Sequence, residues 1–316
     1  DYAMRSGAPL DFSEGKIHAI MEDRDKNLWV GLFQKGIVLM PKQENPFEYY
    51  GNRSIYYNPI GQGCVMSIYQ DSNRHLWVGA DNEGIFELDA EGKRLRHYQP
   101  GNNPRSMANT IMCMYEDTNG DFWLGTYTRG LAKLNRRTGE CEYPLPVDNE
   151  KIFSITEDRH KNLYIATFGS GFYRYNLVTR ELKHYESSKD ESGDLTRNEL
   201  ANDWVNYIFC DSEGMIWLGH YKGISCFNPV NESFINYRNV NTLIEDRVGY
   251  VLQEDHAGNI WAGTTDGLYR FNKKTEELTC FTVADGLPNN VICGICEDEE
   301  HNMWISTYMG ICKYNV

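Results

Sequence analysis

The sequence predicts an all-β fold, a single seven-bladed β-propeller that takes up residues 1–316 as one domain. One motif recurs seven times: an Asp ends a strand, a short polar turn follows, and the next strand carries a central aromatic residue. Successive copies lie 41 to 53 residues apart, a period typical of propellers and solenoids. Short segments rich in β-branched and aromatic residues alternate with Gly, Asn and Asp, the pattern of an all-β array. The shared aromatic residues are Trp29, Trp77, Trp123, Tyr164, Trp217, Trp261 and Trp304.

The sixth copy shows how each repeat divides into four strands. Its expected strands are VGYVLQED, NIWAGT, LYRFN and LTCFTV, separated by the turns HAGN, TDG and KKTEE. Four antiparallel strands in a repeat of this length are the dimensions of one propeller blade. Each repeat is therefore expected to form one four-stranded antiparallel blade.

The repeated residues have expected structural roles. The Asp that ends the first strand can accept hydrogen bonds from amides of the following turn. The Trp of the second strand is suited to filling the gap between neighbouring blades, and burying it contributes on the order of 2–3 kcal/mol. The Gly two residues later, as in Gly125 or Gly263, lets adjacent backbones approach closely.

The two ends of the chain predict how the ring closes. The seventh repeat stops after its third strand, at GICKYNV, whereas the chain begins with DYAMRSG, which matches fourth-strand segments such as HYQPG. We therefore expect the N-terminal strand to complete the last blade beside residues 310–316. This pairing would leave no unprotected sheet edge.

Charge and composition exclude several classes of partner and site. A net charge of −14 argues against nucleic acid as a partner. The sequence contains no run of 18 apolar residues, so we expect no membrane contact by this segment. The nine cysteines are odd in number and irregularly spaced, which does not describe a disulfide framework. Cys293-x-x-Cys296 is better explained by packing than by a metal, and DTNGD at 117–121 lacks the Glu that a calcium loop requires. No cofactor or metal is expected.

The turns between the second and third strands predict the ligand-binding face. These turns vary in length and content, whereas the turns between the first and second strands are nearly uniform, and function usually lies on variable loops of a repeated scaffold. Their aromatic, charged and polar side chains suit sugars, although the aromatic residues could instead pack the loops together. The candidate residues are Phe33, Tyr127, Arg129, Phe168, Trp204, His220, Tyr221, Lys222, Asp266 and Tyr308.

Trp204 is the one tryptophan outside the repeated position. It lies in NDWVN, in a connection where other repeats place residues such as Lys151 or Thr110. A large aromatic side chain there is a stacking platform for a ligand, a contact for another module, or a filler at the edge of a blade. Arg129 and Lys222 could meet a uronate or a sulfate.

The consensus V-x-x-I-x-E-D-x-x-G-N-x-W-x-G-T-x-x-G-G-L, matched by VMSIYQDSNRHLWVGADNEGI, resembles the two-component regulator propeller repeat. The resemblance implies a periplasmic sensor of a hybrid two-component system that detects oligosaccharides from polysaccharide breakdown. It also implies a neighbouring propeller and β-sandwich modules as partners. This chain has one propeller and none of the downstream modules, so we expect it to be an excised half of a sensor's extracellular region.

The sequence is compatible with three functions. The first is a non-catalytic sensor propeller that recognises a carbohydrate or a neighbouring domain. The second is a structural or homodimerising disc, with the ligand bound elsewhere in the parent protein. The third and least favoured is a propeller-fold lyase or hydrolase, because no convergent acid, base or nucleophile motif is recognisable in the sequence.

Overall fold

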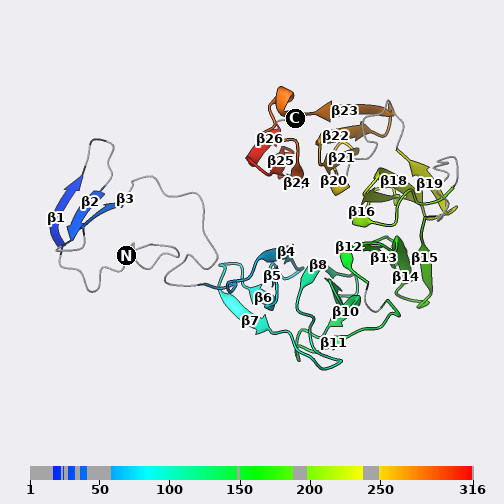
Figure 1. The fold of residues 1–316 in the computed structure, drawn as a ribbon, viewed down its shortest axis with the longest axis horizontal. Coiled ribbons are helices and arrows are strands. Elements are labelled where there is room, and N and C mark those ends of the chain that lie inside the picture. The colour runs from blue at the N-terminus through cyan, green and yellow to red at the C-terminus, as the bar shows by residue number, and fades with distance from the viewer. Residues whose placement is uncertain are drawn as a thin grey trace.

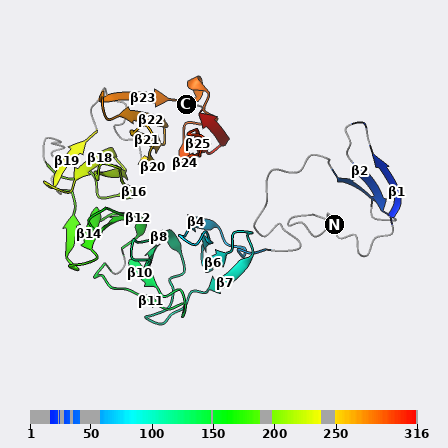
Figure 2. The same ribbon diagram turned by 180° about the vertical axis from the view of Figure 1, so that it is seen from behind.

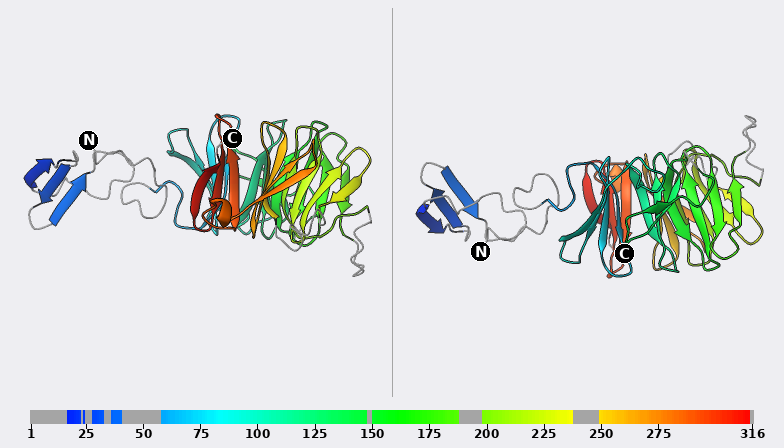
Figure 3. Two further views of the ribbon diagram at one scale, coloured as in Figure 1. Left: turned by 90° about the horizontal axis from the view of Figure 1, so that it is seen from above. Right: turned by 90° about the horizontal axis from the view of Figure 1, so that it is seen from below.

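The structure, a computed structural model, describes residues 17–22, 24, 28–32, 36–40, 58–147, 150–187, 198–237 and 249–314. Its regular elements in these ranges are antiparallel strands and one short 3-10 helix, Val283–Asp285. Six consecutive sheets follow one another around an arc (Figure 1). Seen edge-on, they form a disc (Figure 3). The all-β propeller predicted from the repeats is therefore confirmed in architecture.

We number these six sheets as blades I to VI in chain order. Blade I consists of β4 (Val65–Gln70), β5 (Leu76–Ala80), β6 (Gly84–Leu88) and β7 (Arg94–Tyr98). Blade II consists of β8 (Ile111–Glu116), β9 (Phe122–Thr126), β10 (Leu131–Leu134) and β11 (Cys141–Glu142). Blade III consists of β12 (Ile152–Glu157), β13 (Asn162–Thr167), β14 (Phe172–Asn176) and β15 (Leu182–Tyr185).

The remaining three blades follow the same order of strands. Blade IV consists of β16 (Val205–Cys210), β17 (Ile216–His220), β18 (Gly223–Asn228) and β19 (Ser233–Asn236). Blade V consists of β20 (Gly249–Glu254), β21 (Asn259–Thr264), β22 (Gly267–Asn272) and β23 (Glu277–Phe281). Blade VI has three strands, β24 (Ile292–Glu297), β25 (Met303–Thr307) and β26 (Gly310–Tyr314).

The predicted seven-bladed ring is wrong, because six blades form the propeller. The first repeat folds as a separate three-stranded sheet of β1 (Ile17–Glu22), β2 (Leu28–Leu32) and β3 (Gly36–Met40). This sheet lies apart from the six blades (Figures 1 and 2). Ile20 and Met21 are 60% and 59% exposed, so their side chains are not packed between blades. The repeat encodes the local sheet, whereas membership of the ring requires contact with a neighbouring blade.

Blade VI has three strands among the described residues. The fourth strand that we expected the N-terminus to supply is not among them. Residues 1–16, on which that expectation was placed, lie outside the described residues. Ile311, on the outermost strand β26, is 65% exposed. Within the ranges that the structure describes, no helix has the length and apolar character needed to cross a membrane.

In blades I to VI, the repeated Asp organises the turn between the first two strands. In blade II, one oxygen of Asp117 accepts hydrogen bonds from the amides of Asn119 (2.8 Å) and Asp121 (3.0 Å). Its other oxygen accepts the indole N–H of Trp123 at 2.8 Å. The predicted capping of the turn is confirmed, and the same carboxylate also fixes the orientation of the indole. Blades I, IV and V repeat this bond from Trp77, Trp217 and Trp261.

The indoles of Trp77, Trp123, Trp217 and Trp261 lie between blades, as predicted, whereas that of Trp304 is exposed. Trp77 of blade I lies with its ring centroid 4.5 Å from that of Phe122 in blade II. Trp261 of blade V lies 5.2 Å from Tyr314 in blade VI. Gly125 confirms the predicted close approach of backbones, since a Cβ built there would lie 2.9 Å from the carbonyl oxygen of Ile152.

Neighbouring blades are also joined by a recurring polar contact, which we call the seam latch. The Glu that ends the first strand of one blade accepts a hydrogen bond from the amide just after the repeated Asp of the preceding blade. Glu116 binds the amide of Ser72 at 2.7 Å, and Glu254 binds that of Ser212 at 2.7 Å. At the seam between blades III and IV, Cys210 occupies the position of this Glu. The latch fixes the register of one blade against the next.

Candidate functional site

Three variable turns on blades II, III and IV are held by the same backbone contact. The amide of Tyr127 donates to the carbonyl of Thr110 at 3.1 Å, and that of Phe168 donates to Lys151 at 2.9 Å. The amide of Tyr221 donates to Trp204 at 3.2 Å. Each turn between the second and third strands is therefore tied to the connection that enters its own blade, which places these side chains in equivalent positions.

Aromatic side chains from these turns and from the connection that enters blade IV form a row, which we call the aromatic strip: Tyr127, Phe168, Trp204 and Tyr221. The Phe168 and Trp204 ring centroids lie 4.8 Å apart, and Trp204 meets Tyr221 edge to face at 5.2 Å. The Lys151 ammonium lies 4.9 Å from the Tyr127 ring centroid and 6.0 Å from that of Phe168. The ammonium thus links Tyr127 to Phe168 by cation–π contacts.

The strip combines exposed rings with a fixed support. Tyr127, Trp204 and Tyr221 are 41%, 45% and 47% exposed, whereas Phe168 is half-buried and stacks on Phe153 at 5.0 Å. A backbone bridge pairs Phe168 with Trp204, and the Asn202 side chain accepts the Trp204 amide at 3.0 Å. The rings are therefore held in place while part of their surface faces solvent.

Arg129, beside the strip on blade II, is engaged in structural contacts. Its guanidinium donates to the carbonyls of Ser106 at 2.8 Å and Pro104 at 2.9 Å, and it lies over the Tyr143 ring at 4.2 Å. A hollow of about 620 Å³ adjoins it, lined by Pro104, Arg105, Thr128, Arg129, Cys141, Glu142 and Tyr143. Arg129 thus braces the loop that precedes blade II and forms part of the wall of this hollow.

The repeats match a known family model, described as the two component regulator propeller, at residues 11–34, 59–82, 106–128 and 286–309. The chain carries repeats of the two component regulator propeller family. The resemblance inferred from the repeat pattern is confirmed.

Solved structures with this fold include extracellular domains of bacterial sensors. The extracellular domain of the one component system BT4673 from B. thetaiotaomicron is 21% identical, with a TM-score of 0.64, over 100% of this chain and 40% of that one. The corresponding domain of the hybrid two component system BT3049 is 20% identical, with a TM-score of 0.53, over 95% and 45%. The regulator propeller therefore spans less than half of either domain.

Two further similar proteins are a histidine kinase and a lyase. Histidine kinase P4 of Formosa agariphila is 24% identical over 174 residues, which are 52% of this chain and 12% of that protein. Virginiamycin B lyase from Staphylococcus aureus is 14% identical, with a TM-score of 0.59, over 80% of this chain and 84% of the lyase. At this identity the likeness to the lyase shows a shared propeller fold alone.

The structure brings some of the predicted site residues together and places the others elsewhere. Tyr127, Phe168, Trp204 and Tyr221 come together in the aromatic strip, with half-buried Lys222 next to it in sequence. His220 is 1% exposed, and its Nε2 lies 2.8 Å from the Ser225 hydroxyl.

The other predicted residues lie away from the strip. Asp266 lies in the turn between β21 and β22 of blade V, 3.4 Å from the Asn290 amide nitrogen. Tyr308 is on blade VI and is 72% exposed. Phe33 lies outside the described residues.

Two contributors to the strip were not among the predicted residues. Lys151 and Phe153 belong to the connection and first strand of blade III, and both contact Phe168 of the strip. The signal for Lys151 was its position, which is equivalent to that of Trp204 in the next repeat. All nine cysteines are free, and Cys293 and Cys296 are exposed rather than packed.

Proposed function

We propose that the regulator propeller is a non-catalytic recognition module in the periplasmic, extracytoplasmic region of a two-component sensor, and that its aromatic strip binds an oligosaccharide. The observation that carries this proposal is the set of exposed rings of Tyr127, Trp204 and Tyr221 on blades II and IV. Phe168 and Lys151 of blade III link them. A single exposed aromatic residue is ordinary on a protein surface, whereas a supported row of them is a binding feature.

The chemistry of the strip suits sugars. Pyranose rings present C–H faces that stack on aromatic rings, and their hydroxyls accept hydrogen bonds from ammonium and amide groups. Lys151 places positive charge beside the rings, and Lys222 follows Tyr221 in sequence, in a chain whose net charge is −14. The strip therefore favours an oligosaccharide with a carboxylate or sulfate over a neutral one.

The test is calorimetry of the full chain against neutral, uronate-containing and sulfated oligosaccharides. Trp204→Ala removes the ring that contacts both Phe168 and Tyr221, and we expect roughly ten-fold or greater loss of affinity for the bound sugar. Tyr308→Ala is the matched control, because Tyr308 occupies the equivalent turn of blade VI and is 72% exposed. Equal affinity of all three proteins would refute the strip as the site.

A structural or homodimerising module is the second candidate. The observation in its favour is the exposure of apolar side chains at the two ends of the blade series, where Ile68 and Ile311 are 66% and 65% exposed. Analytical ultracentrifugation separates the two candidates. Binding of no sugar, together with a dimer that Ile68→Lys dissociates, would favour this module over the sensor site.

A further inference from the structure

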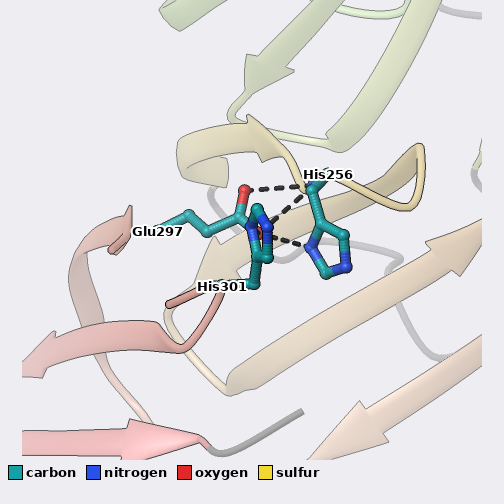
Figure 4. A group of neighbouring side chains, drawn as sticks. All are labelled: His256, Glu297 and His301. Atoms are coloured by element: carbon teal, nitrogen blue, oxygen red, sulfur yellow. Dashed lines mark hydrogen bonds and ion pairs between the residues drawn. The ribbon is translucent and has the colours of Figure 1, made fainter. Parts of the chain in front are cut away.

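A cluster of two imidazoles and one carboxylate lies at the seam between blades V and VI. His256 belongs to the turn between β20 and β21, Glu297 ends β24, and His301 belongs to the turn between β24 and β25 (Figure 4). One nitrogen of each imidazole and one carboxylate oxygen all lie within 4.8 Å of one another. The cluster is on the same side of the blades as the seam latches and is separate from the aromatic strip in sequence and in blade.

Both histidines direct the same ring nitrogen at the same oxygen atom. The Nδ1 atom of His256 lies 2.6 Å from Glu297 Oε1, and the Nδ1 atom of His301 lies 3.4 Å from it. The two imidazoles stack with centroids 3.9 Å apart. His256 and His301 are exposed and Glu297 is half-buried, so the convergent atoms are accessible to an ion from solvent.

The equivalent seams of the same chain carry no such pair of histidines. The positions of His256 and His301 are occupied by Ser72 and Gly120 between blades I and II, and by Ser212 and Gly258 between blades IV and V. The seam latch itself is retained, since Glu297 accepts the His256 amide at 3.0 Å. The latch therefore does not need either imidazole.

The partners of the latch glutamate differ as well. Between blades I and II, Glu116 is paired with the Arg136 guanidinium at 2.5 Å, and between blades IV and V, Glu254 is paired with the Lys273 ammonium at 2.7 Å. Glu297 instead has two imidazoles within reach of one oxygen. Imidazole nitrogens can release their protons and ligate a metal, which a guanidinium cannot do.

His301 also holds a backbone conformation that favours glycine. Its φ is 66°, close to the 81° of Gly120 and the 83° of Gly258 at the equivalent turn position. A left-handed conformation is uncommon for a residue with a side chain, although His tolerates it better than most. The turn is therefore compatible with an imidazole that projects toward Glu297.

We propose that His256, Glu297 and His301 bind a divalent transition-metal ion of the Zn²⁺ class across the seam of blades V and VI. Two imidazole nitrogens and one carboxylate oxygen are a donor set that Zn²⁺ accepts, with water in the remaining position. Metal binding requires the ligating imidazole nitrogens to be unprotonated, so it releases the protons that they carry. Because its ligands come from two blades, the bound metal crosslinks blade V to blade VI, whatever ligand the aromatic strip takes.

The test is titration of the full chain with ZnCl₂ by calorimetry, with reversal by EDTA. Cys64, Cys293 and Cys296 are replaced by Ser throughout, because these three thiols are exposed and would bind zinc themselves. His256→Ser and His301→Gly introduce the residues found at the neighbouring seams, so both variants are expected to fold. We expect saturable binding of one ion in the parent protein and roughly ten-fold or greater loss of affinity in each variant.

His75→Gln is the matched control. His75 lies in the corresponding turn of blade I and pairs with Glu87 at 2.9 Å, a contact of one histidine with one carboxylate. Its substitution should leave zinc affinity unchanged. Zinc should also raise the thermal midpoint of the parent protein and of His75→Gln, but not that of His256→Ser or His301→Gly. Absence of EDTA-reversible binding by the parent, or equal affinity of parent and His256→Ser, would overturn the proposal.

Discussion

Blades V and VI carry the same aspartate–tryptophan motif in different surroundings. Trp261 donates to Asp255 at 2.7 Å and Trp304 donates to Asp298 at 2.8 Å, so the local geometry is the same. Trp261 is 1% exposed, however, and Trp304 is 44% exposed. The difference teaches that the repeat specifies its own turn and indole orientation, while burial of the indole comes from the next blade.

The contacts of the other tryptophans support this conclusion. Trp77, Trp123, Trp217 and Trp261 each contact an aromatic residue of the following blade: Phe122, Tyr175, Phe271 and Tyr314, respectively. Trp304 is in blade VI, the last of the series. Its exposure therefore shows that, without a following blade, the motif orients the indole but does not bury it.

The largest expected effect is that of Trp261→Ala. It removes a buried indole between two blades, and a large-to-small substitution of this kind costs about 4 kcal/mol of unfolding free energy. Chemical denaturation measures the loss, with Trp261→Phe as the conservative control. A cost no larger than that of Trp304→Ala would break the comparison between the two blades.

Lys273→Met should have the next largest effect, about 3 kcal/mol, because it leaves buried carboxylates without their cation. The Lys273 ammonium lies 3.2 Å from Asp211, whose side chain is 0% exposed, and 2.7 Å from Glu254. Its counterpart for comparison is Lys313 of blade VI, which is 33% exposed and 3.9 Å from Asp298. Lys313→Met should change the unfolding free energy by less than about 0.5 kcal/mol. Urea denaturation of both variants checks the contrast, and similar losses would contradict it.

Asp255→Asn should cost about 2 kcal/mol, because an amide cannot accept all the hydrogen bonds that the carboxylate accepts. Burial raises the pKa of Asp255, but hydrogen bonds from Asn259, Trp261 and turn amides outweigh it and lower the pKa below its usual value. The group therefore stabilises the fold above about pH 4, and the contribution is lost as pH falls through the lowered pKa. Thermal midpoints measured from pH 6 to pH 2 should fall less steeply for the variant. An unchanged slope would show that Asp255 does not contribute.

Trp304→Ala, the counterpart of Trp261→Ala, should cost only about 1 kcal/mol of unfolding free energy. The indole is 44% exposed, so the substitution removes one hydrogen bond to Asp298 and part of an apolar contact. Denaturation under the conditions used for Trp261→Ala gives the direct comparison. A loss above about 3 kcal/mol would show that the indole is covered in solution.

The sequence predicted the local structure well because its determinants are local. The role of Asp117 in its turn and the close approach at Gly125 follow from residue chemistry within one repeat. The number of blades was predicted wrongly, because counting repeats does not show whether a sheet is packed between neighbours. Ile20, 60% exposed on β1, is an example of a repeat residue without such packing.

The candidate site was predicted in part for the same reason. Equivalent turn positions indicated Tyr127, Phe168 and Tyr221. The structure joins Phe168 to Tyr221 through Trp204, and Tyr127 to Phe168 through Lys151. Lys151 was missed because its contact with Tyr127 joins two blades and has no signature within either repeat. The burial of His220 depends on the Ser225 hydroxyl of the adjacent strand, a pairing that turn composition does not reveal.

The seam latches join adjacent blades, so the stability of this molecule is a sum of the interactions between neighbouring blades. A central blade is held on both sides, whereas blades I and VI each have one blade partner among the described residues. Local unfolding therefore begins at blades I and VI and then spreads to the blades between them. Amide protons of β24 and β25 should exchange with solvent faster than those of β12 and β13, even though these two strand pairs have the same antiparallel pairing.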